Sequence, residues 1–237
     1  MIKDFFKKIF PKDFVERLYV PYSMFFKNTH KEALRKCGMQ VQINGPIKGT
    51  PEFVEMEDFT RIQADTRFTS SGGTVKIKKY TAVGAECLFI PGNHIPTVGL
   101  PQFLSITHVN DTQSEIVLEE DVWAGSRCTF LQKAHVGRGA VVAACSLVNK
   151  KIPPYAVVGG VPAKVIAVRF NLEQILEHER ILYAPEERLE RSYLEHLFES
   201  EYKGLRTIGT SEMSEEDRLK LNQAKELYNI PIYEGNQ

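Results

Sequence analysis

The strongest constraint in this sequence is an apolar or small residue that returns every six positions from Leu118 to Val148. Steps of six residues scatter around an α-helix, whereas in extended chain every sixth residue faces the same way. The period therefore predicts a β-solenoid, whose short strands stack coil on coil around one inner stripe. The repeated positions are Leu118, Ala124, Phe130, Val136, Val142 and Val148, with a second small or β-branched residue four positions later at Val122, Cys128, Ala134, Ala140 and Ser146.

The same register divides the chain into three regions. It recurs upstream at Met56, Ile62 and Phe68, and at Ile77, Val83 and Phe89. We expect the solenoid domain to span residues 41–168, between an N-terminal helical cap over 1–40 and a helical C-terminal region over 169–237, where apolar residues recur at helical spacing. The N-terminal segment is basic and Phe-rich. It is expected to cover the open end of the solenoid, and weak contact with a membrane surface is the alternative.

The register is lost from Pro91 and recovered at Leu118. The intervening stretch is rich in Gly and Pro and predicts a loop, over 91–115, that projects from the stack. Long loops of this kind usually carry function. Any catalytic residues are therefore sought first in this loop.

Composition restricts the class of protein. Lys plus Arg and Asp plus Glu number 30 each in the 237 residues, which gives no electrostatic case for nucleic acid as a partner. Four cysteines lack paired metal-type spacing, and Cys87 and Cys128 occupy inner positions of the repeat, as expected in a reducing compartment. No secretory signal and no transmembrane segment of about 20 apolar residues is recognised. A cytoplasmic protein is expected.

Several ordered motifs follow the repeat. They are the D-V-W-A-G turn at 121–125, V-G-R-G-A-V at 136–141, V-N-K-K-I-P-P-Y at 148–155 and V-G-G-V-P-A-K at 158–164. Together they resemble the hexapeptide-repeat acyltransferases, over roughly residues 56–168. The segment V-R-F-N-L-E-Q-I-L-E-H-E that follows is similar to the branch that acetylates sugars and xenobiotics.

The resemblance implies a mainly β fold, a left-handed parallel β-helix of triangular section, here with N-terminal and C-terminal helical appendages. It also implies a homotrimer, with acetyl-CoA as acyl donor in grooves between subunits. The activity implied is O-acetylation of a sugar or glycan precursor in polysaccharide biosynthesis.

In this branch the general base is a His in the projecting loop, after Asn and a small residue, which matches Gly92, Asn93 and His94 here. We expect His94 to take the proton of the acceptor hydroxyl during direct transfer, without a covalent acyl-enzyme. Asn93 and His108 are expected to bind the acceptor, and His108 is the reserve candidate for the base. His135 is expected to face outward from the solenoid.

The family's coenzyme groove maps onto small residues of the solenoid. Gly125 is expected at a corner, while Ala143 and Ala144 stand where relatives have small residues beside the pantetheine arm. Trp123 either lines this groove or packs between subunits.

Lysines near the end of the repeat are the candidates for the phosphates of CoA. Lys150 and Lys151 form a pair that could meet them as mobile point charges, and Lys164 and Arg169 follow near the adenine end.

Three other functions are weighed. The acceptor could be an antibiotic or another small alcohol, or the solenoid could be a non-catalytic scaffold. A γ-carbonic-anhydrase-like zinc enzyme requires three His ligands, two of them spaced H-x₄-H, and His94, His108 and His135 lack that spacing. No metal site is therefore predicted. Neither the acceptor nor a residue that orients the His94 ring is identified from the sequence.

Overall fold

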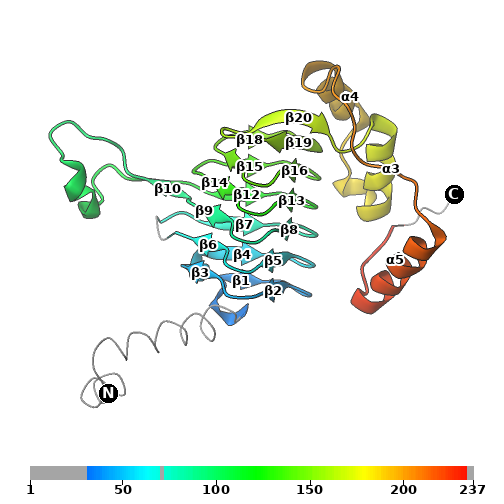
Figure 1. Ribbon diagram of the computed structural model, residues 1–237, viewed down its shortest axis with the longest axis horizontal. Helices are drawn as coiled ribbons and strands as arrows, with labels where there is room; N and C mark the ends of the chain where they lie inside the picture. Colours follow the sequence, from blue (N-terminus) through cyan, green and yellow to red (C-terminus); the bar gives the residue numbers. More distant parts are fainter. Residues whose placement is uncertain (1–30, 70–71, 234–237) are drawn as a thin grey trace, which may run out of the picture.

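The computed structural model describes residues 31–69 and 72–233, and these form a parallel β-solenoid with helices at its C-terminal side (Figure 1). It is the left-handed parallel β-helix that the family resemblance implies. The expected N-terminal cap and its membrane contact fall mostly on residues 1–30, outside the described part. None of the helices in the described ranges is long and apolar enough to cross a membrane.

Three sheets form the faces of the solenoid. Sheet A consists of β1 (Lys36–Cys37), β4 (Val54–Met56), β7 (Val75–Ile77), β12 (Ile116–Leu118), β15 (His135–Val136) and β18 (Lys151–Ile152). Sheet B consists of β2 (Gln42–Asn44), β5 (Arg61–Gln63), β8 (Ala82–Val83), β13 (Trp123–Ala124), β16 (Val141–Val142), β19 (Ala156–Gly159) and β20 (Lys164–Val168). Sheet C consists of β3 (Lys48–Gly49), β6 (Arg67–Phe68), β9 (Leu88–Phe89), β14 (Thr129–Phe130) and β17 (Leu147–Val148).

Each coil runs through sheets A, B and C in turn, so the molecule has an A–B corner, a B–C corner and a C–A corner. Strand pairing within these three sheets is parallel except between β19 and β20, where the chain turns back over the last coil. Short 3₁₀ helices η2 (Lys31–Ala33) and η3 (Pro51–Phe53) lie before the first two sheet A strands, β1 and β4. The first sheet A strand, β1, already pairs with β4, so the stack begins before residue 41.

The inward positions are those that the six-residue period predicts. Every repeated position from Met56 to Val148 is buried, including the second set that contains Cys87 and Cys128. Phe68, Phe89 and Phe130 stack in successive coils with ring centroids 5.0 and 4.7 Å apart. The buried hydroxyls of the inner stripe bond to backbone carbonyls, as Thr60 does to Glu57 at 2.7 Å, so no polar group of this kind opposes burial.

The corners require left-handed backbone conformations at residues other than Gly, which the sequence does not indicate. The third residue after an inward-facing position adopts a positive φ, as at Phe59 (+56°), Tyr80 (+66°), Arg127 (+61°) and Cys145 (+61°). This left-handed region is unfavourable for residues other than Gly. The tight corner is therefore maintained by the stacking of neighbouring coils rather than by local preference.

Helices α3 (Leu172–Leu182), α4 (Arg191–Ser200) and α5 (Glu215–Tyr228) lie on the side of the solenoid opposite the projecting loop (Figure 1). Asn171 begins α3 with a capping box to Gln174, and the short η5 (Pro185–Glu187) separates α3 from α4. Ile175, Leu194 and Tyr202 are buried in the main core, so the helices extend it beyond the last coil.

Buried charges attach α3 to the A–B corner. Glu179 is only 1% exposed; it accepts a hydrogen bond from Tyr155 Oη at 2.6 Å and pairs with Arg138 at 3.0 Å. Nearby, Asp121 accepts hydrogen bonds from Arg169 at 2.6 Å and His178 at 2.9 Å. Arg169, a candidate for the adenine end of CoA, is therefore engaged at this corner.

We expect Glu179→Ala to destabilise the docking of the C-terminal helices by about 3–5 kcal/mol, because Arg138 and the Tyr155 hydroxyl lose their buried partner. Hydrogen exchange of residues 172–228 measures this. The control is Glu177→Ala, which removes an exposed pair with Arg180 and should cost less than about 1 kcal/mol. If Glu179→Ala fails to fold, Glu179→Gln provides the comparison. Equal protection of the helices in the Glu177 and Glu179 variants would contradict this assignment.

Candidate active site on the projecting loop

The projecting loop leaves the C–A corner as a short antiparallel ribbon. Strand β10 (Gly92–Asn93) pairs with β11 (Thr112–Gln113), and the 3₁₀ helix η4 (Gln102–Thr107) lies in the loop beyond them. Gly73 allows the base of the ribbon to pass close to the coil below, since a Cβ there would lie 2.1 Å from the Ser114 carbonyl oxygen. The base is also held from the coil above, where Gln132 donates to Thr112 Oγ1 at 2.7 Å.

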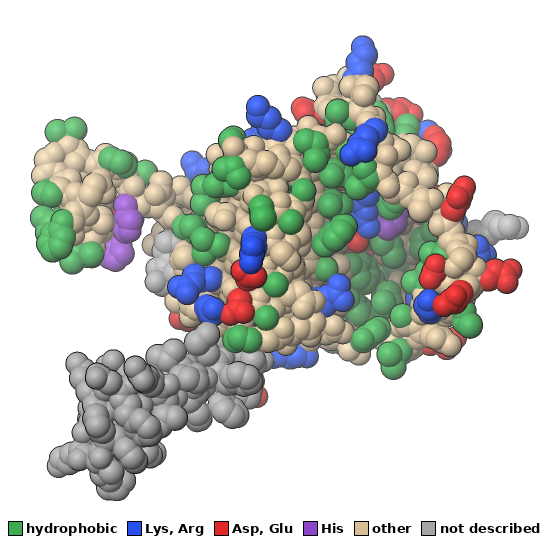
Figure 2. Space-filling view, in the orientation of Figure 1, with side chains coloured by type: hydrophobic (Ala, Val, Ile, Leu, Met, Phe, Trp, Pro, Cys, Tyr) green, Lys and Arg blue, Asp and Glu red, His purple; other side chains and the backbone are tan. Residues whose placement is uncertain are grey.

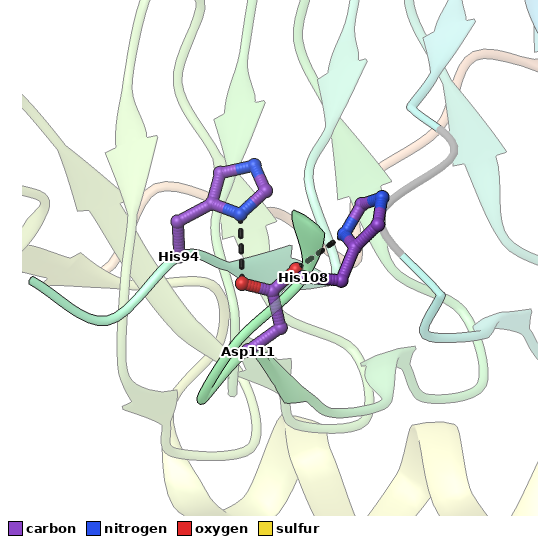
Figure 3. Close-up of side chains that lie close together, drawn as sticks. All are labelled: His94, His108 and Asp111. Carbon is purple, nitrogen blue, oxygen red and sulfur yellow. Dashed lines mark hydrogen bonds and ion pairs between the residues drawn. The ribbon is translucent and has the colours of Figure 1, made fainter. Parts of the chain in front are cut away.

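The ribbon places one carboxylate between two imidazoles. Because Asn93 pairs with Thr112, the next residues outward on the two strands, His94 and Asp111, lie opposite each other. His94 Nδ1 is 2.8 Å from Asp111 Oδ1, and His108 Nδ1 is 2.6 Å from Asp111 Oδ2 (Figure 3). The ring centroids of the two histidines are 5.7 Å apart.

The hydrogen bonds determine which imidazole nitrogen is free. An ionised carboxylate only accepts hydrogen bonds, so each neutral ring carries its proton on Nδ1 and leaves the Nε2 lone pair available. Both Nε2 atoms lie on the ring sides away from Asp111 (Figure 3). The side chains of His94 and His108 are 48% and 68% exposed, and that of Asp111 is 18% exposed. The cluster therefore presents two solvent-accessible imidazole nitrogens whose rings are held by one carboxylate.

The electrostatics of the cluster favour an anionic Asp111. The hydrogen bond from His108, followed by that from His94, lowers the pKa of the Asp111 carboxyl below its ordinary value. Asp111 is thus a permanent acceptor for both rings at neutral pH.

Asp111 is the member of this cluster that sequence reasoning missed. It is the only charged residue from Pro91 to Ser114. A lone carboxylate in an otherwise uncharged loop, three positions after His108, is the signal that could have identified it. His108 ends η4 with a positive φ of +56°, and its ring lies toward Asp111. Nothing in the sequence indicates this backbone conformation.

Four of the residues expected to bind the coenzyme lie along the B–C corner. Gly125 and Ala143 begin equivalent turns in successive coils, and Ala144 follows Ala143. In the next layer of the stack, Lys164 pairs with Gly159. A Cβ on Gly125 would lie 2.7 Å from the Ala144 backbone nitrogen, so this glycine is required by close stacking of coils. The corner is therefore a strip of small residues that ends at a lysine.

Trp123 projects from sheet B beside this strip. It is flanked in register by Ala82 and Val141 and is 59% exposed. Its large apolar surface is available either to a ligand or to another chain.

The paired lysines lie at a different corner. Lys150 follows sheet C at the C–A corner, and Lys151 begins β18 of sheet A. Together with Pro153, beyond β18, they line a groove of about 360 Å³ against Tyr193 of α4. Sheet C separates this corner from the B–C strip. One chain thus does not bring all of the expected coenzyme residues together. His135, expected to face outward, lies half-buried on sheet A with its side chain 41% exposed, and it pairs with Glu119 at 2.8 Å.

Comparisons with known proteins agree with the sequence motifs. A chloramphenicol acetyltransferase from Klebsiella aerogenes is 41% identical over 75 residues, which are 32% of this chain and 36% of that protein. A 2,3,4,5-tetrahydropyridine-2,6-dicarboxylate N-acetyltransferase from Staphylococcus aureus is 45% identical over 53 residues, 22% of each chain. The matches thus span about a third or less of the relatives' length. No model of a protein family matches the chain.

Solved structures share the fold. A hexapeptide-repeat acetyltransferase from Vibrio cholerae matches with a TM-score of 0.53 and 25% identity, over 58% of this chain and 76% of that one. The same Vibrio protein is also known in complex with acetyl coenzyme A. A maltose O-acetyltransferase from Clostridium difficile 630 has a TM-score of 0.52 at 19% identity, over 58% and 71% of the two chains, and shows likeness of fold alone.

The pKa of the Asp111 carboxyl, which both histidines share as a partner, can be measured. The pKa of Asp111 is expected below the ordinary value of about 3.9. Its carboxylate therefore keeps both hydrogen bonds above that value, and their stabilisation is lost as pH falls through the lowered pKa. Carboxyl ¹³C NMR in metal-free buffer measures it. His108→Ala should raise this pKa because it removes the largest cause of the shift. The control His135→Ala should leave it unchanged. An Asp111 pKa that does not respond to His108→Ala would contradict the geometry.

Proposed function

Since the chain belongs to the hexapeptide-repeat acetyltransferase family, we propose that it transfers an acetyl group from acetyl-CoA to a hydroxyl of a sugar or glycan precursor. The observation that carries the proposal is the His94–Asp111 hydrogen bond of 2.8 Å on the projecting loop. It supports a neutral imidazole whose Nε2 is free to accept a proton.

The proposed chemistry is direct transfer. His94 Nε2 takes the proton of the acceptor hydroxyl as that oxygen attacks the thioester carbonyl carbon. The C–S bond of the resulting tetrahedral intermediate breaks, and the thiolate leaving group takes the proton from His94. Asp111 acts as a positioning residue, because it holds the ring in one tautomer and stabilises the imidazolium formed in between. Asn93 and His108, adjacent to the base in the ribbon, bind the acceptor.

The B–C strip is proposed as the acetyl-CoA groove. Gly125, Ala143 and Ala144 carry no bulk, so the pantetheine arm can approach the backbone of successive coils. Lys164, above them, meets the phosphates, and Trp123 supplies an apolar wall. Lys150 and Lys151 supply charge to phosphate from the groove beside α4.

We further propose a homotrimer whose sites form between subunits. The loop and the paired lysines lie at the C–A corner and the small strip at the B–C corner, so a neighbouring copy is needed to bring both halves together. The loop also exposes apolar side chains suited to such a contact (Figure 2). These are Ile95, Val98, Phe103, Leu104, Ile106 and Val109.

A second acceptor class is a small non-sugar alcohol. The match to a chloramphenicol acetyltransferase at 41% identity favours it. A panel of acceptors decides between the two classes, because the base and donor chemistry are the same for both.

We expect His94→Ala to lower kcat by about 10²–10⁴-fold, as for loss of a general base. Thiol release from acetyl-CoA, measured with a panel of sugars and of small alcohols including chloramphenicol, tests this. Asp111→Asn should lower kcat less, and the control His135→Ala should match the wild type. Full activity of His94→Ala with its best acceptor would reject His94 as the base.

Shared sites predict complementation between variants. Lys164→Glu should raise KM for acetyl-CoA because it reverses a charge at the phosphates. When the His94→Ala and Lys164→Glu chains are co-expressed, some mixed trimers contain one site with both native residues, and activity should exceed that of either variant alone. Sedimentation should give three times the 27.0 kDa chain mass. A monomer, or mixed assemblies without recovered activity, would contradict a site shared between subunits.

A further inference from the structure

We infer that His94, His108 and Asp111 form a binding site for a divalent transition metal of the Zn²⁺ class, in which the metal replaces the two Nδ1 protons. No metal-ligand spacing marks these residues in the sequence, and the ribbon alone assembles them. The proposal of metal binding is based on the positions of the three side chains. The effect of metal binding on catalysis rests on the proposed function.

The donor set suits zinc. Two imidazole nitrogens and a carboxylate oxygen, with a fourth position left to water, form a three-residue set that Zn²⁺ favours. One ligand atom from each of the three residues lies within 4.8 Å of the other two. Tetrahedral zinc with bonds of about 2.0–2.2 Å holds its ligand atoms roughly 3.3–3.6 Å apart. Modest rotation of exposed side chains therefore converts the hydrogen-bonded triad into a coordinated one.

The ribbon preorganises the three ligands. His94 and Asp111 are fixed across the strand pair, and His108 is directed toward them by the end of η4. The two exposed imidazoles give a metal ion direct access from solvent (Figure 2). Within residues 31–69 and 72–233, no other three His, Cys, Asp or Glu side chains are grouped in this way.

Metal binding and general-base action exclude each other at His94. In the hydrogen-bonded triad, Nδ1 carries the proton and Nε2 is the base. A metal on Nδ1 requires the other neutral tautomer, in which the proton has moved through solvent to Nε2. Each ring stays neutral, so no net proton is released, but Nε2 can no longer accept a proton from the acceptor. Zn²⁺ is therefore a reversible inhibitor of acetyl transfer.

Binding is tested on the untagged, metal-stripped full-length chain. Calorimetric titration with ZnCl₂ should give one metal per chain, and CoCl₂ should produce the visible absorption of tetrahedral Co²⁺. His108→Ala and Asp111→Asn should each weaken binding by at least about tenfold. His135→Ala, a histidine of sheet A paired with Glu119, is the matched control and should bind as the wild type does.

Inhibition is tested in the thiol-release assay. Zn²⁺ at concentrations that saturate the calorimetric site should inhibit transfer, EDTA should restore it, and His108→Ala should raise the inhibition constant by the same factor as the Kd. Absence of stoichiometric binding, or wild-type affinity in the His108→Ala and Asp111→Asn variants, would overturn the site. Binding without inhibition would overturn the competition between metal and base. A chain that transfers acetyl to no acceptor would refute the proposed function, while the metal titration would still decide the site.

Discussion

The structure depends on the stacking of inward-facing side chains from one coil onto the next. Phe68, Phe89 and Phe130 show this directly, since their rings stack although up to 41 residues separate neighbours in sequence. Burial of such apolar surface stabilises by about 25 cal/mol per Å². The same stacking offsets the unfavourable positive φ that each tight corner requires. The projecting loop and the helices of the described residues are positioned relative to this inner column.

The column also explains how a long loop is accommodated. Leu118 pairs with Ile77 on one side and Val136 on the other, so the coils remain in register across the insertion. The loop leaves at a corner, where no inward position is displaced. A rigid stack thus carries a projecting ribbon with little cost to the core, and the ribbon becomes the place where reactive side chains can face solvent.

Two carboxylates of the same charge have different roles because one is buried and the other lies on an exposed ribbon. Glu179 is buried with Arg138 and Tyr155, where its charge attaches α3 to the A–B corner. Asp111 lies on an exposed ribbon between two imidazoles, where its charge sets their tautomer. Helix α3 is attached at the A–B corner, the loop and Lys150 lie at the C–A corner, and the strip of small residues lies at the B–C corner. This division of corners supports a site built from neighbouring copies.

The sequence by itself determined the solenoid, its inward residues and the loop, because a six-residue period fixes which side chains share a face and is interrupted where the loop begins. The choice of His94 as the candidate base came from the family resemblance of the Gly92–Asn93–His94 motif. The sequence did not determine the partner of His94, since Asp111 lies 17 residues away and meets it only through the pairing of β10 with β11. Nor did it reveal that Lys150 and Lys164 lie at different corners, or that Glu179 is buried. Those facts depend on contacts between coils and helices, which only the tertiary structure decides, because distant residues come together through packing and not through spacing.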